Sequence, residues 1–497
     1  MIATPHVDWF ALSPSLALLV AGAASLLGAV LVPRRARRPF GATVCAFGFA
    51  GAIVAAALLY AFSPDGHGVI GDAIQRDRLG ALATMIVAGA GFLAVWTSAT
   101  EPMPDDHIAE FFALLLASGA GMAFFVGSAN LMVLFLSLEW FSIALYVMCA
   151  IDYDFEGALE AGLKYLIVGS FGAATLLFGS ALVYGATGKI SFDGIAATIG
   201  SQGLAGDTFV VVGIALMVAG LGFKMSAAPF HMWTPDVYEG APTTVTAWMS
   251  SATKVAALLL TFRVMTTAFP HNQHLWGWAF AIIATISLAI GNFAALVQKN
   301  VKRILAYSAI AQAGFMLIGL STGSALGGRA LMYYLIPYSA SAFGSFAIVA
   351  ARERELGVPV TLDNLAGFGW ARPFLGVAMW FFVFGFAGLP LTGGFVGKFY
   401  VFAAAYDHGW AWLVIVGVLA TLVSLYYYLG IVRAMYMRGP EELQLRPGNV
   451  AVSGGAPAKE TLLHLAVGAA LVVAVGSLFA VQPLIDLAQH AASALPV

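Results

Sequence analysis

Long runs of apolar residues, separated by short polar connections, are the main pattern along the chain. A helix needs about 20 apolar residues, range roughly 17–25, to cross a bilayer. Fourteen such runs occur, without the period-two alternation of transmembrane strands. They cover residues 14–32, 40–62, 79–97, 110–127, 130–150, 160–184, 207–239, 244–268, 275–297, 303–321, 327–351, 374–405, 410–437 and 461–481. The pattern predicts an all-α membrane protein with about 14 transmembrane helices.

Two of the predicted spans contain helix-breaking residues in their middle. Span 7 has Pro229 after Ala227-Ala228, and span 12 has Gly-Leu-Pro-Leu-Thr-Gly-Gly at 388–394. Proline removes a backbone hydrogen bond and glycine loosens the turn. Non-helical backbone at membrane depth persists only where protein or water satisfies its polar groups. Broken helices in the two halves of a chain therefore point to an ion pathway, with a simple packing kink as the alternative.

The spacing of the two breaks predicts an internal repeat. Spans 7 and 12 are five helices apart, and the second copy of a five-helix unit must be inverted in the membrane. We therefore expect two inverted repeats, spans 4–8 and 9–13. The expected units are residues 1–109 (helices 1–3), 110–268 (first repeat), 269–437 (second repeat) and 438–497 (a loop and helix 14).

Composition supports the membrane class and excludes others. The hydrophobic residues make up 61% of the chain, the charged ones only 10%, and the mean hydropathy is +0.89. A soluble domain has about 25% charged residues. Cys45 and Cys149 lie in apolar runs and form no disulfide framework, and the net charge of −2 does not suit a nucleic-acid partner. The expected surroundings are membrane lipid.

The basic residues of the connections predict the orientation, because Lys and Arg concentrate on the cytoplasmic side. The even-numbered connections carry only Arg76, Arg78 and Lys189. The odd-numbered ones carry fourteen: Arg34, Arg35, Arg37, Arg38, Lys299, Lys302, Arg303, Arg352, Arg354, Arg372, Arg433, Arg438, Arg446 and Lys459. The odd-numbered connections are therefore expected on the cytoplasmic side and both termini on the opposite side. No Lys or Arg precedes the first run, so it is expected to be a permanent helix.

Several ionisable residues fall inside the predicted spans. Arg263 and Arg329 are near span ends, where snorkelling is the simplest expectation. The deeper group consists of Glu139, Lys164, Lys224, Lys254 and Lys398. Each charge at a helix centre costs roughly 2.5–3.5 kcal/mol when it faces lipid, so these side chains must face one another, water or a partner. Buried ion pairs are one alternative, but four lysines cannot all pair with one glutamate. A buried amine without a carboxylate holds its proton less tightly, as a proton relay requires.

Weaker signals allow both structural and functional interpretations. Lys164 lies one turn after Glu160, so an ordinary i,i+4 pair is its default role. His231 could line a channel or only cap and pack. Tyr333, Tyr334 and Tyr338 of span 11, and Ser308 and Gln312 of span 10, could hold water. The histidines show no metal-ligand spacing, and Gly393–Lys398 fails as a phosphate loop because Phe399 replaces the required Ser or Thr.

One segment carries a specific resemblance. The chain reads Gly-Phe-Lys-Met-Ser-Ala-Ala-Pro-Phe-His at 222–231, Trp-Thr-Pro-Asp-Val-Tyr-Glu-Gly-Ala-Pro at 233–242 and Ser-Ala-Thr-Lys at 251–254. It closely resembles the antiporter-like membrane subunits of NADH-quinone oxidoreductase, respiratory complex I, over nearly its whole length. Lys398 stands where the sibling subunit M typically has Glu, and a lateral helix of the kind that subunit L carries is not expected after span 14.

The resemblance implies a proton-translocating part of an enzyme complex that has no redox centre of its own. NADH, FMN, iron–sulfur clusters and quinone would belong to partner subunits, with subunits M and K as neighbours. Glu139 would be the ion partner of Lys224, Lys254 the central carrier, and Lys398 the residue that passes the proton toward the periplasm. Lys164 and His231 are further candidates.

Two alternatives remain at this point. One is a subunit of a multi-component sodium/proton antiporter, which shares the lysines of spans 7 and 8. The other is a structural spacer with vestigial charges. Co-purification with flavin and iron–sulfur absorbance would exclude the antiporter, which has neither. Intact pumping after substitution of all four lysines would support the structural spacer.

Overall fold

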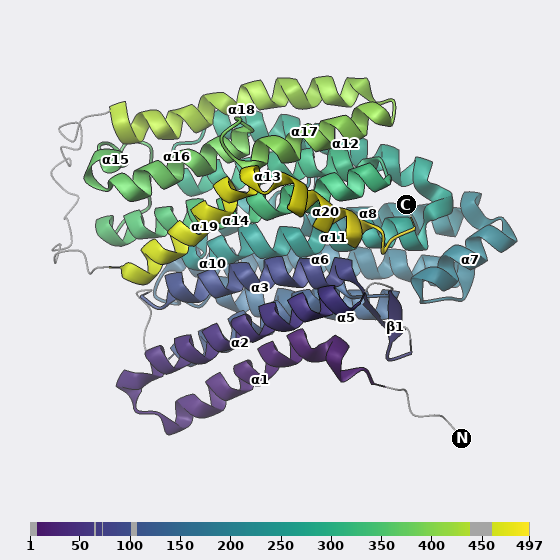
Figure 1. Cartoon of the computed structure of the whole chain (residues 1–497), viewed down its shortest axis with the longest axis horizontal. Helices are drawn as coiled ribbons and strands as arrows, with labels where there is room; N and C mark the ends of the chain where they lie inside the picture. Colours follow the sequence, from purple (N-terminus) through teal and green to yellow (C-terminus); the bar gives the residue numbers. More distant parts are fainter. Residues whose placement is uncertain (1–6, 64–65, 72, 101–106, 438–459, 497) are drawn as a thin grey trace.

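The computed structural model describes residues 7–63, 66–71, 73–100, 107–437 and 460–496 as one bundle of roughly parallel helices. Figure 1 shows α1 (Trp9–Leu31) and α2 (Arg34–Phe62) along one edge of this bundle and α18 (Ala411–Met437) along the opposite edge. Arg438, Arg446 and Lys459, used for the predicted orientation, lie outside the described residues.

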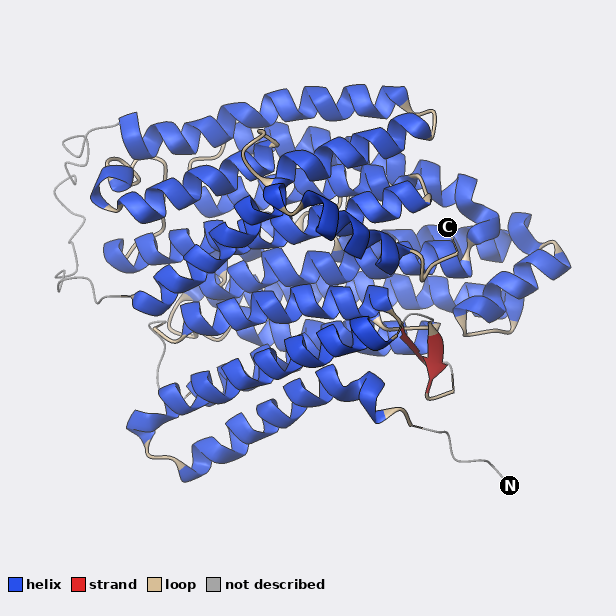
Figure 2. Ribbon diagram, in the orientation of Figure 1, coloured by secondary structure: helices blue, strands red, loops and turns tan. Residues whose placement is uncertain are grey.

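Within the described ranges, twelve helical segments are long and apolar enough to cross a membrane, and they agree with twelve of the predicted spans. Besides α1, α2 and α18 these are α3 (Arg78–Ser98), α4 (Ile108–Val126), α5 (Leu131–Cys149), α6 (Glu156–Thr187), the segment α10–η2–α11 (Thr243–Ala268), the segment η3–α12 (Pro270–Leu296), α13 (Val301–Ser321), α14 (Ala325–Leu356) and α19 (Thr461–Phe479). Figure 2 shows how completely helices dominate the molecule.

Predicted spans 7 and 12 are each divided into two helices, as the proline and glycine residues suggested. The first consists of α8 (Thr208–Lys224) and α9 (Trp233–Gly240). The second consists of α16 (Pro373–Ala387) and α17 (Gly393–Asp407). The interruption of both spans is therefore a feature of the structure.

Both breaks begin with the same backbone turn. Ser226 has φ 60° after α8, and Gly388 has φ 75° after α16. The next amide bonds five residues back in each case, from Ala227 N to the Gly222 carbonyl at 2.9 Å and from Leu389 N to the Phe384 carbonyl at 3.0 Å. This is the 6→1 closure of a helix C-terminus, and it leaves carbonyl groups of the last turn free for other donors.

Span 8 contains a distortion that the sequence pattern did not predict. α10 (Thr243–Trp248) passes into a π-helical turn, η2 (Met249–Thr253), before α11 (Lys254–Ala268) begins. All residues of η2 are buried. Such turns are rare and occur frequently at functional sites.

Smaller elements complete the described chain. A hairpin pairs β1 (His67–Val69) with β2 (Ile74–Arg76), His67 opposite Arg76. The others are α7 (Phe192–Gln202), η1 (Leu204–Gly206), η3 (Pro270–Asn272), α15 (Phe368–Ala371) and α20 (Val481–Ala492).

The interior of the bundle is formed by a few completely surrounded helices. In an 18-residue apolar stretch of each span, 100% of the residues are buried in the span-8 segment and 94% in both α13 and α14. The buried share is only 33% in α1 and α2 and 28% in α18. The peripheral helices expose apolar side chains to lipid or to other subunits. Lys254 therefore lies at the centre of the protein.

The snorkelling predicted for Arg263 is wrong. Its side chain is only 4% exposed and forms a bidentate pair with Asp77, through Nη1–Oδ2 at 2.5 Å and Nη2–Oδ1 at 2.8 Å. Asp77 also accepts a hydrogen bond from the Gly80 amide as the N-cap of α3. The pair ties α11 to α3, and a carboxylate at a helix N-terminus allows Arg263 to remain buried. Arg329, in contrast, donates to Gln489 at an exposed position.

Candidate functional site

Lys224 lies at the last residue of α8, immediately before the first break, and is only 1% exposed. Its Nζ donates to Ser142 Oγ at 2.7 Å and to Tyr165 OH at 3.2 Å. It also lies 4.6 Å from the centre of the Phe141 ring. An ammonium group carries three donors. Two of them bond to hydroxyl oxygens here, and the aromatic face accommodates the remaining charge.

Glu139, the predicted ion partner of Lys224, is close to it but not in contact. It lies on α5, three residues before Ser142, and is half-buried. Its Oε1 is buried without a hydrogen-bond partner in the described chain, and no ion pair joins it to Lys224 there. Glu139 nevertheless shares a face of α5 with Ser142, which is a hydrogen-bond partner of Lys224. The structure thus shows this pair in an open arrangement.

Lys254, the predicted central carrier, is fully buried and reaches back to the first break. Its Nζ donates to the carbonyl oxygen of Met225 at 2.9 Å. Met225 follows the last residue of α8, so this carbonyl belongs to the negative end of a half-helix. The π-helical turn η2 directly precedes Lys254 on its own segment.

Lys398 has a similar partner at the second break. Its side chain is 4% exposed, and Nζ donates to the carbonyl of Ala387, the last residue of α16, at 3.4 Å. The ammonium also stands 3.7 Å from the centre of the Phe315 ring. Met225 and Ala387 each precede the residue with positive φ. Lys254 and Lys398 are therefore held by equivalent carbonyls of the two broken spans.

Protein groups satisfy the backbone that the two breaks set free. The amide of Ala228 donates to Ser287 Oγ at 2.8 Å, and Trp233 Nε1 donates to the Phe223 carbonyl at 3.0 Å. At the second break, Gln312 Nε2 donates to the Phe386 carbonyl at 2.8 Å. Non-helical backbone can thus remain at membrane depth because it is surrounded by protein.

A neutral polar network fills the region between the centre and the second break. Tyr334 OH donates to Gln312 Oε1 at 2.6 Å, and Ser308 Oγ bonds to Tyr428 OH at 2.5 Å. Tyr428 also accepts from Gln312 Nε2 at 3.2 Å. Tyr428 was missed in the sequence, where nothing distinguished it from other aromatic residues of its span.

A small pocket adjoins this network. Ser250, Ser308 and Ser345 lie on its wall, together with Tyr338, whose hydroxyl donates to the Ser250 carbonyl at 3.2 Å. Ser250 belongs to the π-helical turn that precedes Lys254. The expectation that Ser308 and Tyr338 face a place for water stays a prediction.

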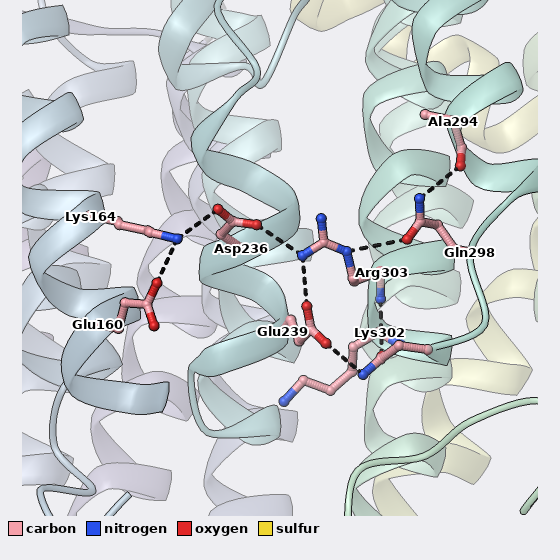
Figure 3. Close-up of polar contacts among 9 residues, drawn as sticks. Glu160, Lys164, Asp236, Glu239, Ala294, Gln298, Lys302 and Arg303 are labelled. Carbon is pink, nitrogen blue, oxygen red and sulfur yellow. Dashed lines mark hydrogen bonds and ion pairs between the residues drawn. The ribbon is translucent and has the colours of Figure 1, made fainter. Parts of the chain in front are cut away.

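Lys164 lies in a separate cluster of charges, shown in Figure 3. Its Nζ pairs with Glu160 at 2.7 Å and with Asp236 at 2.9 Å, and its side chain is 43% exposed. The i,i+4 pair is confirmed. Arg303 extends the cluster, with Nη1 2.9 Å from Asp236 and 2.7 Å from Glu239. A role of Lys164 in proton transfer stays a prediction.

The same cluster continues to α14. Lys302 lies in the first turn of α13, and its Nζ donates to Thr243 Oγ1 at 2.9 Å and lies 3.7 Å from Glu353. Thr243 in turn donates to Glu353. The cluster was missed in the sequence because Lys302 was assigned to a connection; the i,i+3 spacing of Asp236 and Glu239 was the available signal.

His231 lies in the connection between α8 and α9, and its Nδ1 is buried without a hydrogen-bond partner in the described chain. Its neighbour Met232 is 73% exposed. The proposed place of His231 on a channel stays a prediction. Within the described ranges, no group of His, Cys, Asp and Glu side chains could hold a metal ion.

Comparison with known proteins gives a consistent result. Residues 128–424 match the family model described as NADH:quinone oxidoreductase/Mrp antiporter, TM. A curated relative, NADH-quinone oxidoreductase subunit N of Trichlorobacter lovleyi, is 38% identical over 430 residues, which is 86% of this chain and 88% of that protein.

Solved structures with the same architecture support the match. A chain of respiratory complex I from Thermus thermophilus with bound aureothin is 29% identical, with a TM-score of 0.79 over 96% of this chain and 99% of that one. A chain of the Mrp complex from Dietzia sp. has a TM-score of 0.85 over 98% and 97%, at 22% identity. The second likeness shows the fold alone.

Proposed function

The chain belongs to the NADH:quinone oxidoreductase/Mrp antiporter family, and we propose that its buried Glu139, Lys224, Lys254 and Lys398 form the proton relay of a membrane-arm subunit. Its curated relatives are N subunits of NADH-quinone oxidoreductase, and the chain is accordingly a proton-translocating subunit of that complex. Electron transfer takes place in partner subunits, which hold NADH, FMN, the iron–sulfur clusters and quinone.

One observation carries the relay. Lys224, Lys254 and Lys398 are 1%, 0% and 4% exposed, and their described hydrogen bonds go to hydroxyls or backbone carbonyls. Permanent buried ion pairs therefore do not explain them. Lysines held by neutral acceptors at helix breaks can gain and lose a proton without breaking a salt bridge, which supports transport over a purely structural role.

In the proposed sequence of events, Glu139 sets the proton affinity of Lys224. When the carboxylate approaches, the charged lysine is favoured; when the pair opens, the proton is released more easily. Lys254 then acts as the central carrier, fed from the cytoplasmic side, and Lys398 passes the proton toward the periplasm. Water and the hydroxyls of Tyr334 and Tyr428 connect the last two, with Lys164 and His231 at the cytoplasmic entry.

The finer architecture belongs to the same proposal. Counting each broken pair as one span adds two to the twelve candidate spans and gives fourteen. The inverted repeats would be residues 110–268 and 269–437, with both termini periplasmic in a bacterial inner membrane and with subunits M and K as neighbours.

The relay is tested in membranes that carry Lys224→Ala or Glu139→Ala, with proton pumping and NADH oxidation measured side by side. Pumping should be abolished while the complex still assembles. Lys189→Ala is the matched control, because Lys189 is exposed and lies in the connection between α6 and α7. Normal proton stoichiometry in the two relay variants would contradict the proposal.

The antiporter alternative differs in an observable that needs no mutation. A subunit of NADH-quinone oxidoreductase co-purifies with flavin and iron–sulfur absorbance, whereas an ion-driven antiporter has neither. The Mrp likeness at 22% identity gives no residue-level reason to prefer the antiporter.

A further inference from the structure

Two hydroxyl groups hold Lys224 in its open arrangement. Ser142 and Tyr165 provide the two hydroxyl acceptors of its Nζ, and both side chains are fully buried. Neither side chain can take the positive charge itself. Their contribution must come from where they place the ammonium, which is one helical turn beyond Glu139.

Ser142 is oriented to accept a hydrogen bond. Its hydroxyl donates to the Leu138 carbonyl of its own helix, so its lone pairs face Lys224. Because residues three apart share one helix face, Glu139 and Ser142 offer neighbouring acceptors to the same long side chain. Lys224 donates to Ser142, and the buried Oε1 of Glu139 has no donor in the described chain.

Tyr165 is held rigidly by other aromatic residues. Its ring stacks on Trp233, with centroids 4.5 Å apart and planes at 10°, and meets the edge of Tyr146 at 4.8 Å. Trp233 begins α9 and donates through Nε1 to the carbonyl of Phe223, the residue before Lys224. The stack therefore links α9 and the end of α8 to the hydroxyl that holds the ammonium.

We infer that Ser142 and Tyr165 are positioning residues that keep the Lys224 ammonium off Glu139 and so hold the relay pair open. This inference rests on the proposed role of the pair. An orphaned buried carboxylate oxygen is costly, and the pair closes as soon as the competing acceptors are lost. The two hydroxyls therefore set the populations of the open and closed states. The free-energy difference between these states depends on the interactions that Lys224 makes in each of them.

Ser142→Ala combined with Tyr165→Phe tests the inference in the assembled complex. In a high-resolution cryo-EM map, Lys224 Nζ should lie at ion-pair distance from Glu139, and the number of protons pumped per NADH oxidised should fall several-fold. The single variant Ser142→Thr keeps a hydroxyl at this position and should pump normally. An ammonium that stays off Glu139 in the double variant, or pumping equal to that of the controls below, would overturn the inference.

Matched controls exist for both changes. Ser137 lies on the same helix and donates to the Val133 carbonyl as Ser142 does to that of Leu138, without contacting Lys224. Tyr238 meets Trp233 edge-on, and its buried hydroxyl has no partner in the described chain. Ser137→Ala and Tyr238→Phe should pump normally. Tyr165→Phe alone keeps the ring stack and removes only the hydroxyl. It replaces the double variant as the test if that variant fails to assemble, and Lys224 is again expected at ion-pair distance from Glu139.

The outcomes separate this inference from the proposed function. Full pumping by Lys224→Ala would end the relay itself. Loss of pumping in Lys224→Ala together with normal pumping in the double variant would leave the relay standing and remove only the positioning role of Ser142 and Tyr165.

Discussion

The break between α8 and α9 and the break between α16 and α17 have the same backbone turn but different chemistry around it. Both close with a residue of positive φ and a five-residue amide-to-carbonyl bond. Near the first break lie the two hydroxyls that accept hydrogen bonds from Lys224 and, on the same helix face as one of them, the Glu139 carboxylate. Near the second, Lys398 has a carbonyl and an aromatic ring. The turn supplies a common scaffold, and the side chains decide whether the site can switch.

The difference suggests a division of labour. A lysine with a nearby carboxylate has two competing positions and can respond to charge elsewhere in the complex. A lysine enclosed by neutral groups has one position and can only pass its proton on. In the proposed relay, the first break would regulate proton transfer and the second would complete it.

The largest difference in proton pumping is expected between a variant that loses the acidic group near the first break and a variant that loses one hydroxyl of the neutral network. Glu139→Gln keeps the shape of the side chain but removes its proton chemistry, and proton pumping should fall by roughly a hundredfold, the lower end of what a positioned proton-transfer group contributes. Tyr334→Phe removes one hydrogen bond of the neutral network, worth about 1 kcal/mol, and should reduce pumping about fivefold at most. Pumping assays in membranes of both variants check this, and equal losses would erase the proposed difference.

Gly388→Ala should have the next largest effect. An L-residue at its φ of 75° costs about 1–2 kcal/mol. The new Cβ would also lie 2.7 Å from Cδ of Lys398. We expect a lower midpoint of thermal inactivation and impaired pumping together. Gly188→Ala has a similar φ of 65° and open space around it, so it should show the stability loss without the pumping defect. Intact pumping in Gly388→Ala would show that Lys398 need not keep this position.

The aromatic contacts of the two lysines should differ in importance. Phe315→Leu removes the ring 3.7 Å from Lys398 Nζ, whose single described hydrogen bond is long, and a desolvated cation–π contact is worth about 2 kcal/mol. Phe141→Leu removes a ring 4.6 Å from Lys224, which retains two hydroxyl acceptors. The midpoint of thermal inactivation should fall further for Phe315→Leu. The reverse order would mean that hydroxyls do not replace the ring.

Part of this arrangement could be predicted from the sequence. Charges in apolar runs and Pro or Gly in the middle of a span are local signals, so the candidate relay and both breaks were found. Partners supplied by distant helices leave no such signal: Ser142 and Tyr165 look like ordinary residues of their spans, and Asp77 reaches Arg263 across 186 positions. The π-helical turn before Lys254 was also missed, because Met-Ser-Ser-Ala-Thr contains no helix-breaking residue.

Ser226 provides the smallest and most discriminating test of the shared turn. It has φ 60° where the second break has glycine, so Ser226→Gly should relieve backbone strain of about 1–2 kcal/mol. The greater freedom of glycine in the unfolded chain offsets about 0.4–1 kcal/mol of that gain. The expected result is a slight rise in the midpoint of thermal inactivation with normal pumping, since the Ser226 side chain is not among the partners of Lys224 or Lys254. A clear fall in pumping would show that the first break needs its serine, and that the two turns differ in more than their surroundings.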